Sequence, residues 1–253
     1  MGFEKISYQV EDGAAWIRLA SPPLNIVDLE MMRELIDAVE KAEKEADVVV
    51  IGSEGKHFSA GAEIKEHFPD KAPELISTFT ELIGRILRCE KVTVAAVKGY
   101  ALGGGFEIPL ACDIILASQN AKMGVPEITL SHYPPIAIAL LPRMIGWKNA
   151  YDIILTGEAV DANRAREMGI VSRVFSDDTF DDEVKKYVRG LLEKSPAALR
   201  ITKKAIKASI SLPFDSLTDI INDIYLSQLI KTEDAVEGLN AFLEKRKPVW
   251  RSK

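Results

Sequence analysis

The sequence predicts an α/β fold with a parallel sheet, followed by a segment that is helical almost to its end. Short β-branched runs at residues 48–53 and 92–98 are typical of strands buried on both faces. Amphipathic helical stretches alternate with such runs over the first two-thirds of the chain, as in proteins built from strand–helix units. From Asp181 onward the apolar pattern is helical, which indicates an appended helical part.

The first strand–helix unit begins with a hairpin. Residues 3–10 and 14–20 alternate apolar and polar side chains around Asp12-Gly13, a dipeptide typical of tight hairpin turns. Asp28 predicts the N-cap of a helix over residues 29–46. The apolar face of this helix carries Leu29, Met32, Leu35, Ile36 and Val39. The buried strand over 48–53 and a polar, glycine-containing loop follow.

A second unit repeats this order. Pro73 predicts the start of a helix that continues to about Arg88, and the strand over 92–98 leads into a glycine-rich turn over 99–105. Short strands are expected at 114–117 and 122–125, helices at 106–111, 136–145 and 149–155, and a helix capped by Asp161 before a strand at 170–175. We therefore expect a core over residues 1–190 and a helical C-terminal segment over residues 191–253.

Composition and charge exclude several classes of protein. The chain has 253 residues, a net charge of −6 and 47% hydrophobic residues, which excludes a disordered chain. The mild acidity disfavours a nucleic-acid binder, whose affinity depends on clustered Lys and Arg. No apolar run reaches the roughly 18–20 residues of a membrane span, and the polar N-terminus is unlike a secretory signal. Cys89 and Cys112 lie in apolar segments and are read as reduced core residues, so we expect a cytoplasmic enzyme or binding protein.

Several common signatures are missing from the chain. It contains no G-x-G-x-x-G dinucleotide fingerprint, no G-x-x-x-x-G-K-[ST] phosphate loop, no G-x-S-x-G nucleophile elbow and no H-E-x-x-H motif. The histidines His57, His67 and His132 are widely separated and lack the spacing of metal ligands. We therefore expect no metal site.

Three segments contain residues suited to chemistry, and each has a purely structural interpretation as well. Residues 98–113 place three glycines before a helix with Glu107; the glycines allow either a tight strand–helix crossing or the approach of a ligand to free N–H groups. Residues 122–135 place Glu127 directly after Pro126, where a lone glutamate is more commonly solvated. Small residues in segment 57–66 either let a ligand reach the backbone or form a plain polar loop.

Taken together, these segments resemble the enoyl-CoA hydratase/isomerase superfamily, which has the crotonase fold. The F-x-A-G-A-[DE]-I-K-E stretch of that family occurs at residues 58–66, A-x-G-G-G-x-E-x-x-x-x-C-D at residues 101–113 and P-E-I-x-L at residues 126–130. The resemblance implies a spiral of β-β-α turns with a helical C-terminal trimerisation segment. It also implies a homotrimer, or a homohexamer formed as a dimer of trimers.

The resemblance also assigns site residues. It implies that the backbone N–H groups of Ala62 and Gly104 hold the thioester oxygen and that Glu107 and Glu127 are the catalytic carboxylates. Coenzyme A is expected only as part of the thioester substrate, with no permanently bound cofactor. Residues implied in binding coenzyme A or substrate are Ala60, Gly61, Ala62, Glu63, Ile64, Lys65, Gly103, Tyr133 and Pro134.

The presence of both glutamates favours a hydratase. Hydration of a conjugated thioester builds negative charge on the carbonyl oxygen, and two fixed N–H donors stabilise it. One ionised glutamate takes a proton from water and one protonated glutamate delivers a proton to the α-carbon, and mutual repulsion with partial burial favours a single shared proton. A double-bond isomerase, thioester hydrolase or decarboxylase on the same fold is the alternative.

The loop after Glu127 departs from ordinary enoyl-CoA hydratases. Residues 131–142 resemble the F-P-P-x-A…L-L-P pattern of cyclohexa-1,5-diene-1-carbonyl-CoA hydratases. Pro134-Pro135 would stiffen the wall beside Glu127, and Tyr133 and Ile136 would make it apolar; neutral variation in a surface turn is the alternative.

Two further expectations concern partners. Some relatives of this fold bind RNA, and the best basic candidate here is Lys203, Lys204 and Lys207, which at helical spacing is more commonly a solvated face or a contact for the coenzyme phosphates. The last quarter has more apolar residues than a lone terminal helix needs, which predicts a subunit interface. These residues are Ile210, Leu212, Phe214, Leu217, Ile220, Ile221 and Ile224.

Overall fold

The computed structural model describes residues 2–210 and 214–252, with the side chains of 214–217 left out. It divides the chain into two compact units, Met1–Cys89 with Thr93–Lys186, and Glu90–Val92 with Tyr187–Lys253. The boundary between them falls inside helix α6 (Phe180–Leu192). The domain boundary expected at residue 190 stays a prediction.

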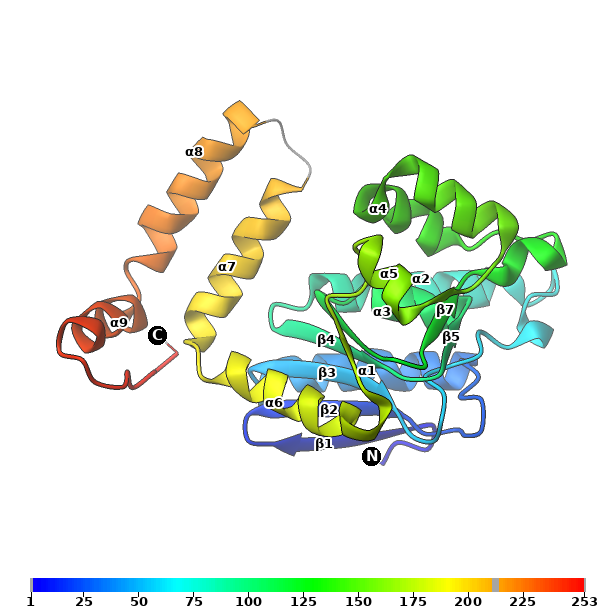
Figure 1. The fold of residues 1–253 in the computed structure, drawn as a ribbon, viewed down its shortest axis with the longest axis horizontal. Helices are drawn as coiled ribbons and strands as arrows, with labels where there is room; N and C mark the ends of the chain where they lie inside the picture. The colour runs from blue at the N-terminus through cyan, green and yellow to red at the C-terminus, as the bar shows by residue number, and fades with distance from the viewer. Residues whose placement is uncertain (1, 211–213, 253) are drawn as a thin grey trace. The chain divides into compact units, whose positions relative to one another are not determined.

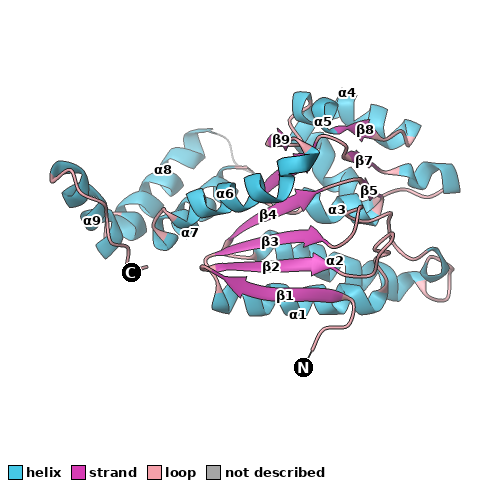
Figure 2. Cartoon of the chain, turned by 60° about the horizontal axis from the view of Figure 1, so that its bottom comes forward, coloured by secondary structure: helices cyan, strands magenta, loops and turns pink. Residues whose placement is uncertain are grey.

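The first unit is built on a twisted sheet in which the strands lie in the order β1-β2-β3-β4-β6-β9. Only the pair β1–β2 is described as antiparallel, whereas β2–β3, β4–β6 and β6–β9 are parallel, as the sequence predicts. Figure 2 shows β1 to β4 side by side. The strands are β1 (Ile6–Glu11), β2 (Ala14–Leu19), β3 (Val48–Ser53), β4 (Val92–Val97), β6 (Ile114–Ser118) and β9 (Arg173–Phe175).

Local sequence signals account for the start of this unit. Asp12 and Gly13 have φ values of 51° and 86°, the left-handed conformation that a tight hairpin turn requires, so the predicted hairpin is confirmed. The carboxylate of Asp28 accepts the N–H of Met31 at 2.8 Å and begins helix α1 (Leu29–Glu45). All six residues of β3 are buried, because α1 covers one face of the sheet and the start of α6 lies over the other. Helix α2 (Ala72–Arg88) packs against α1 (Figure 1).

A small second sheet joins β5 (Tyr100–Leu102), β7 (Lys122–Gly124) and β8 (Val160–Asp161). The helical elements around it are α3 (Gly104–Leu110), the short 3-10 helix η2 (Pro126–Leu130), α4 (Pro135–Thr156) and α5 (Ala162–Glu167). Helix α4 is interrupted at Gly146, whose φ of 75° and ψ of 162° are not helical, which agrees with the two helices that the sequence predicts there. Strand β5 leads into α3, so this sheet determines where the glycine-rich turn lies.

The described part of the second unit is helical, as predicted. It contains the end of α6 and helices α7 (Pro196–Ser209), α8 (Phe214–Ile224) and α9 (Glu233–Leu243), with a π-helical turn over Tyr225–Leu229. Asp234 is buried, and its carboxylate accepts the hydroxyl of Ser195 at 2.6 Å and the backbone N–H groups of Arg251 and Ser252 at 2.7 and 3.1 Å. This network fastens the C-terminal tail to the beginning of α7.

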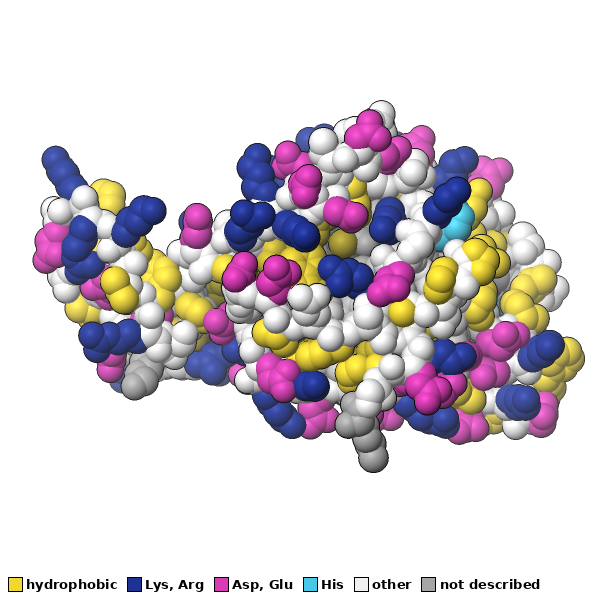
Figure 3. Space-filling view, turned by 90° about the horizontal axis from the view of Figure 1, so that it is seen from below, with side chains coloured by type: hydrophobic (Ala, Val, Ile, Leu, Met, Phe, Trp, Pro, Cys, Tyr) yellow, Lys and Arg dark blue, Asp and Glu magenta, His cyan; other side chains and the backbone are white. Residues whose placement is uncertain are grey.

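The lysine cluster on α7 is only in part the solvated face that the sequence suggests. Lys203 is buried and its ammonium group donates to the carbonyl of Lys91 at 2.6 Å, whereas Lys204 is exposed. On the face drawn in Figure 3, basic and acidic side chains are interspersed. The cluster therefore does not form a continuous basic surface of the kind that binds nucleic acid.

Many apolar side chains of the second unit are exposed. Ile210 is 66% exposed and Phe242 82%, whereas Ile224 is buried. Of the residues expected at an interface, Leu212 and the side chains of Phe214 and Leu217 lie outside the described residues. Among the described helices, none is long and apolar enough to cross a membrane.

Candidate active site

The three segments that the sequence analysis selected line one cavity of about 500 Å³ in the first unit. The lining residues come from segments 60–69, 103–104 and 126–132. Bridges between short extended pieces hold these segments together, because Ser59 pairs with Ala101 and Val27 pairs with Ala62. The N–H of Gly103 donates to the carbonyl of Gly124 at 2.9 Å. Residues about 20–40 positions apart in the chain are therefore held together at this wall.

Two backbone N–H groups are available at this cavity. Gly104 is the first residue of α3, and a Cβ built on it would lie 3.4 Å from the Cβ and 3.7 Å from the nitrogen of Ala62. Within the described part of the chain, the N–H groups of Ala62 and Gly104 donate no hydrogen bond. Two neighbouring unused donors, one of them at a helix N-terminus, are suited to hold a negatively charged oxygen.

The consecutive glycines serve both purposes that the sequence left open. A Cβ on Gly105 would lie 2.5 Å from the hydroxyl of Ser59, so this glycine permits a close strand–helix crossing. Gly103 has a φ of 53°, and a Cβ there would lie 2.6 Å from Oε1 of Glu127. Gly103 therefore lets a carboxylate approach the backbone beside the two donors.

Glu107 projects from α3 and is 2% exposed. Its Oε1 accepts the N–H groups of Ile136 and Ala137 at 2.9 and 2.8 Å, in the first turn of α4. Burial, together with the smaller effect of the negative charge of Glu127, raises the pKa of Glu107 to about 7, although the two N–H bonds act in the opposite direction. Glu107 does not line the cavity itself, but it lies close enough to Glu127 for their charges to interact.

Glu127 lies in η2 and faces the cavity. Its Oε2 is buried and has no hydrogen-bond partner among the described residues. Burial raises the pKa of this carboxyl as well. A buried carboxyl oxygen without a partner is costly unless it is protonated or meets a ligand, so Glu127 is placed to exchange a proton with a bound molecule.

Of the other residues expected at the site, some line the cavity and some do not. Residues 60–62, Ile64 and Gly103 line the cavity, whereas Glu63 and Lys65 do not. The carboxylate of Glu63 instead accepts the N–H of Lys65 at 3.0 Å. Tyr133 is 66% exposed and Pro134 is buried, and neither lines the cavity. Among the described residues, no group of three or more His, Cys, Asp or Glu side chains could hold a metal ion.

Two histidines at the cavity were missed by the sequence analysis. His67 and His132 both line it, together with the apolar side chains of Phe68, Pro69 and Leu130. From the sequence these histidines are candidates only for metal ligands. Their positions were a usable signal, because His67 directly follows the motif at 58–66 and His132 comes two residues after the motif at 126–130.

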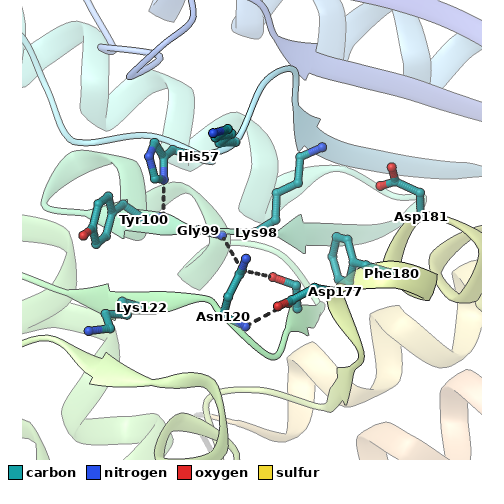
Figure 4. Close-up of a pocket in the computed structure, with 11 residues that line it drawn as sticks. His57, Lys98, Gly99, Tyr100, Asn120, Lys122, Asp177, Phe180 and Asp181 are labelled. Carbon is teal, nitrogen blue, oxygen red and sulfur yellow. Dashed lines mark hydrogen bonds between the residues drawn. The ribbon is translucent and has the colours of Figure 1, made fainter.

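A second cavity of about 480 Å³ in the first unit contains neither glutamate. Figure 4 shows its lining, where the ring of His57 stacks on that of Tyr100 with centroids 4.6 Å apart. The side-chain oxygen of Asn120 accepts the backbone N–H of Gly99 at 3.2 Å, and the backbone N–H of Asn120 donates to the carboxylate of Asp177 at 2.9 Å. These bonds join the turns that close the cavity. Its two carboxylates, Asp177 and Asp181, are exposed, unlike the buried Glu107.

The fold defines a class of protein, the crotonase-fold proteins. The chain belongs to the enoyl-CoA hydratase/isomerase family, which it matches over residues 9–253. The family assignment makes it an enzyme of the enoyl-CoA hydratase type, and the resemblance seen in the sequence is confirmed.

Individual relatives support this assignment. The chain is 32% identical to the cyclohexa-1,5-dienecarbonyl-CoA hydratase of Thauera aromatica, over 94% of this chain and 92% of that protein. It is 33% identical to a probable enoyl-CoA hydratase of Bacillus subtilis, over 97% and 98% of the two chains. Among solved structures, an enoyl-CoA hydratase of Bacillus anthracis superposes with a TM-score of 0.94 at 28% identity, covering 99% of this chain and 100% of that chain. This superposition confirms the crotonase fold.

Proposed function

We propose that the protein adds water to the double bond of an α,β-unsaturated acyl-CoA thioester. The observation that carries the proposal is the buried, unpartnered Oε2 of Glu127 in a cavity that also contains the unused N–H groups of Ala62 and Gly104. The thioester oxygen would accept both N–H groups, which places the conjugated carbons beside the carboxyl pair.

In the proposed reaction one carboxylate takes a proton from water while the water oxygen bonds to the β-carbon. The electron pair of the double bond moves toward the thioester oxygen, and the resulting enolate is stabilised by the N–H groups of Ala62 and Gly104. The other glutamate, in its protonated form, donates a proton to the α-carbon and completes the addition. The pKa of Glu107 near 7 and the raised pKa of Glu127 support a pair that holds one proton at neutral pH.

Coenzyme A enters this reaction as part of the substrate, and the proposed enzyme needs no permanently bound cofactor. We assign the backbone of residues 60–65 to the adenine end of coenzyme A. In the same proposal Gly103 contacts the substrate from the cavity lining, and Tyr133 and Pro134, which lie outside that lining, contact it from the adjoining segment between η2 and α4. We also propose a cytoplasmic location, in keeping with the two cysteines being buried thiols and not a disulfide framework.

For the acyl group we propose an alicyclic dienoyl thioester, cyclohexa-1,5-diene-1-carbonyl-CoA. The Thauera aromatica relative supports this choice, and so does Pro134-Pro135, where Pro134 is buried and Pro135 begins α4. The restricted φ of two prolines stiffens the segment between His132, which lines the cavity, and α4. A flat ring loses less ordering entropy on binding beside a stiff segment than a flexible chain does.

The test is a comparison of kcat/KM for this thioester and for crotonyl-CoA, with product masses measured. We expect the cyclic substrate to be preferred by roughly 10–200-fold, the range of a hydrophobic-pocket preference. Equal or better turnover of crotonyl-CoA would leave a general enoyl-CoA hydratase, and a product without added water would contradict hydration. Replacing Pro134-Pro135 by Gly-Ala should reduce the preference if the stiff wall causes it.

We further propose that the protein assembles as a homotrimer or as a homohexamer of two trimers. Leu226, Leu239, Phe242 and Leu243 of the second unit are each more than half exposed, which is costly for a monomer in water. Light scattering at micromolar concentration should give a trimeric or hexameric mass. A monomeric mass would contradict the proposal.

A further inference from the structure

His67 and His132 approach the cavity from different segments. His67 follows the short 3-10 helix over Ile64–Glu66, and His132 follows η2. Their ring centroids are 6.1 Å apart and the ring planes meet at 89°. Both side chains line the cavity that also contains Glu127 and the N–H groups of Ala62 and Gly104.

Backbone carbonyls determine which nitrogen carries the proton in each ring. Nδ1 of His67 lies 2.9 Å from the carbonyl oxygen of Glu63, and Nδ1 of His132 lies 2.7 Å from that of Leu130. A carbonyl oxygen can only accept, so Nδ1 must donate its hydrogen in both rings. The Nε2 atom of each neutral ring is therefore a hydrogen-bond acceptor, and neither Nε2 has a partner within the described part of the chain.

These two acceptors are poorly suited to a plain hydrocarbon group. The rest of this end of the cavity is apolar, formed by Ile64, Phe68, Pro69 and Leu130. His67 is half-buried and His132 is exposed. Where an acyl group covers Nε2 of either ring it displaces the water that would otherwise donate to that atom, and an acceptor left without a donor lowers affinity. The hydroxyl that hydration creates forms at the β-carbon, which the proposed reaction places between the two glutamates. The histidines are therefore available for a different donor on the acyl group.

We propose that His67 and His132 recognise a hydroxyl group on the acyl moiety, at a carbon beyond the reacting double bond. The inference rests on the hydratase function proposed above. It implies that a ring hydroxyl, which cyclohexa-1,5-diene-1-carbonyl-CoA lacks, would improve the binding of an alicyclic acyl group. A carboxylate fits less well, because the cavity is lined by no Lys or Arg and contains the acidic Glu127.

Three linear substrates of equal chain length test this recognition. Hex-2-enoyl-CoA, 6-hydroxyhex-2-enoyl-CoA and 2,3-dehydroadipyl-CoA end in a methyl, a hydroxymethyl and a carboxylate group. At pH 8, where imidazole is ordinarily neutral, we expect kcat/KM for the hydroxylated substrate to exceed that for the methyl substrate by about tenfold or more. Equal values, or a preference for the carboxylate, would overturn the inference.

Variants then assign the preference to the two rings. His67→Asn and His132→Asn keep an N–H near the position of Nδ1 that can donate to the same carbonyl, and they remove only the Nε2 acceptor. In these variants kcat/KM for the hydroxylated substrate should therefore approach kcat/KM for the methyl substrate. His67→Gln and His132→Gln place an amide oxygen near the position of Nε2 and should restore part of it. Tyr151→Phe, an exposed site on α4 that does not line the cavity, is the control and should keep the preference.

The outcomes separate this inference from the proposed function. Hydration of all three substrates without a hydroxyl preference would refute the role of the histidines and leave the hydratase intact. Failure to hydrate any thioester, cyclic or linear, would refute the proposed function. A preference that survives in the Asn variants would show that other residues recognise the hydroxyl, which also overturns the inference.

Discussion

Replacing Gly103 by Ala should damage catalysis more than stability. A Cβ at this position would lie 2.6 Å from Oε1 of Glu127, so the carboxylate must retreat by about 0.8 Å to reach ordinary contact at 3.4 Å. A displacement near 1 Å at a reacting group costs on the order of 10²-fold in rate. The φ of 53° and ψ of −132° add backbone strain of roughly 1–3 kcal/mol for a residue with a side chain.

The assay combines steady-state hydration kinetics with thermal unfolding of Gly103→Ala and a matched control. Gly169→Ala is the control, because Gly169 also has a positive φ, 89°, but a Cβ there meets nothing within 4 Å. We expect both variants to unfold roughly 2–12 °C below the wild type, at about 2–4 °C per kcal/mol for a chain of this size. Only Gly103→Ala should lose about 10²-fold in kcat. A folded Gly103→Ala enzyme with kcat within about threefold of the wild type would refute the argument that Gly103 positions Glu127.

Three other predictions follow from the same geometry. Glu107→Gln and Glu127→Gln should each lower kcat by about 10²-fold or more, because each removes a positioned acid or base; a folded variant with wild-type kcat would exclude that residue from the mechanism. Because the pKa of Glu107 is about 7 in the folded state against an ordinary 4.5, the folded state binds this proton more tightly than the unfolded chain. Its contribution to the free energy of unfolding should therefore fall as pH rises from roughly 4.5 to 7, and denaturant titrations should show this part of the pH dependence missing from Glu107→Gln. Asp234→Ala removes the acceptor of one hydroxyl and two backbone N–H groups, so the free energy of unfolding should fall by an amount on the order of 2 kcal/mol. Hydrogen exchange at the backbone N–H groups of Arg251 and Ser252 should accelerate. Unchanged exchange there would contradict the role of Asp234 in holding the tail.

Local sequence patterns determined much of the fold. The hairpin at Asp12-Gly13, the N-caps at Asp28 and Asp161, and the buried strand over Val48–Ser53 are all found where the sequence places them. Turn geometry, capping and β-branched burial depend on a few neighbouring residues, so one stretch of sequence contains the information they need. The motif segments were selected for the same reason, since their small residues and glutamates stand at fixed spacings.

Only the tertiary structure decided how distant segments meet. Nothing around Glu107 indicates that the first turn of α4, about thirty positions later, donates two N–H groups to it. Lys203 has the spacing of an exposed face but is buried against Lys91, and His67 meets His132 across the cavity. The placement of Tyr133 outside the cavity lining is equally invisible in the sequence. Burial, pKa and hydrogen-bond partners depend on which segments the folded chain brings together, and a local pattern carries no information about partners that are far away in the sequence.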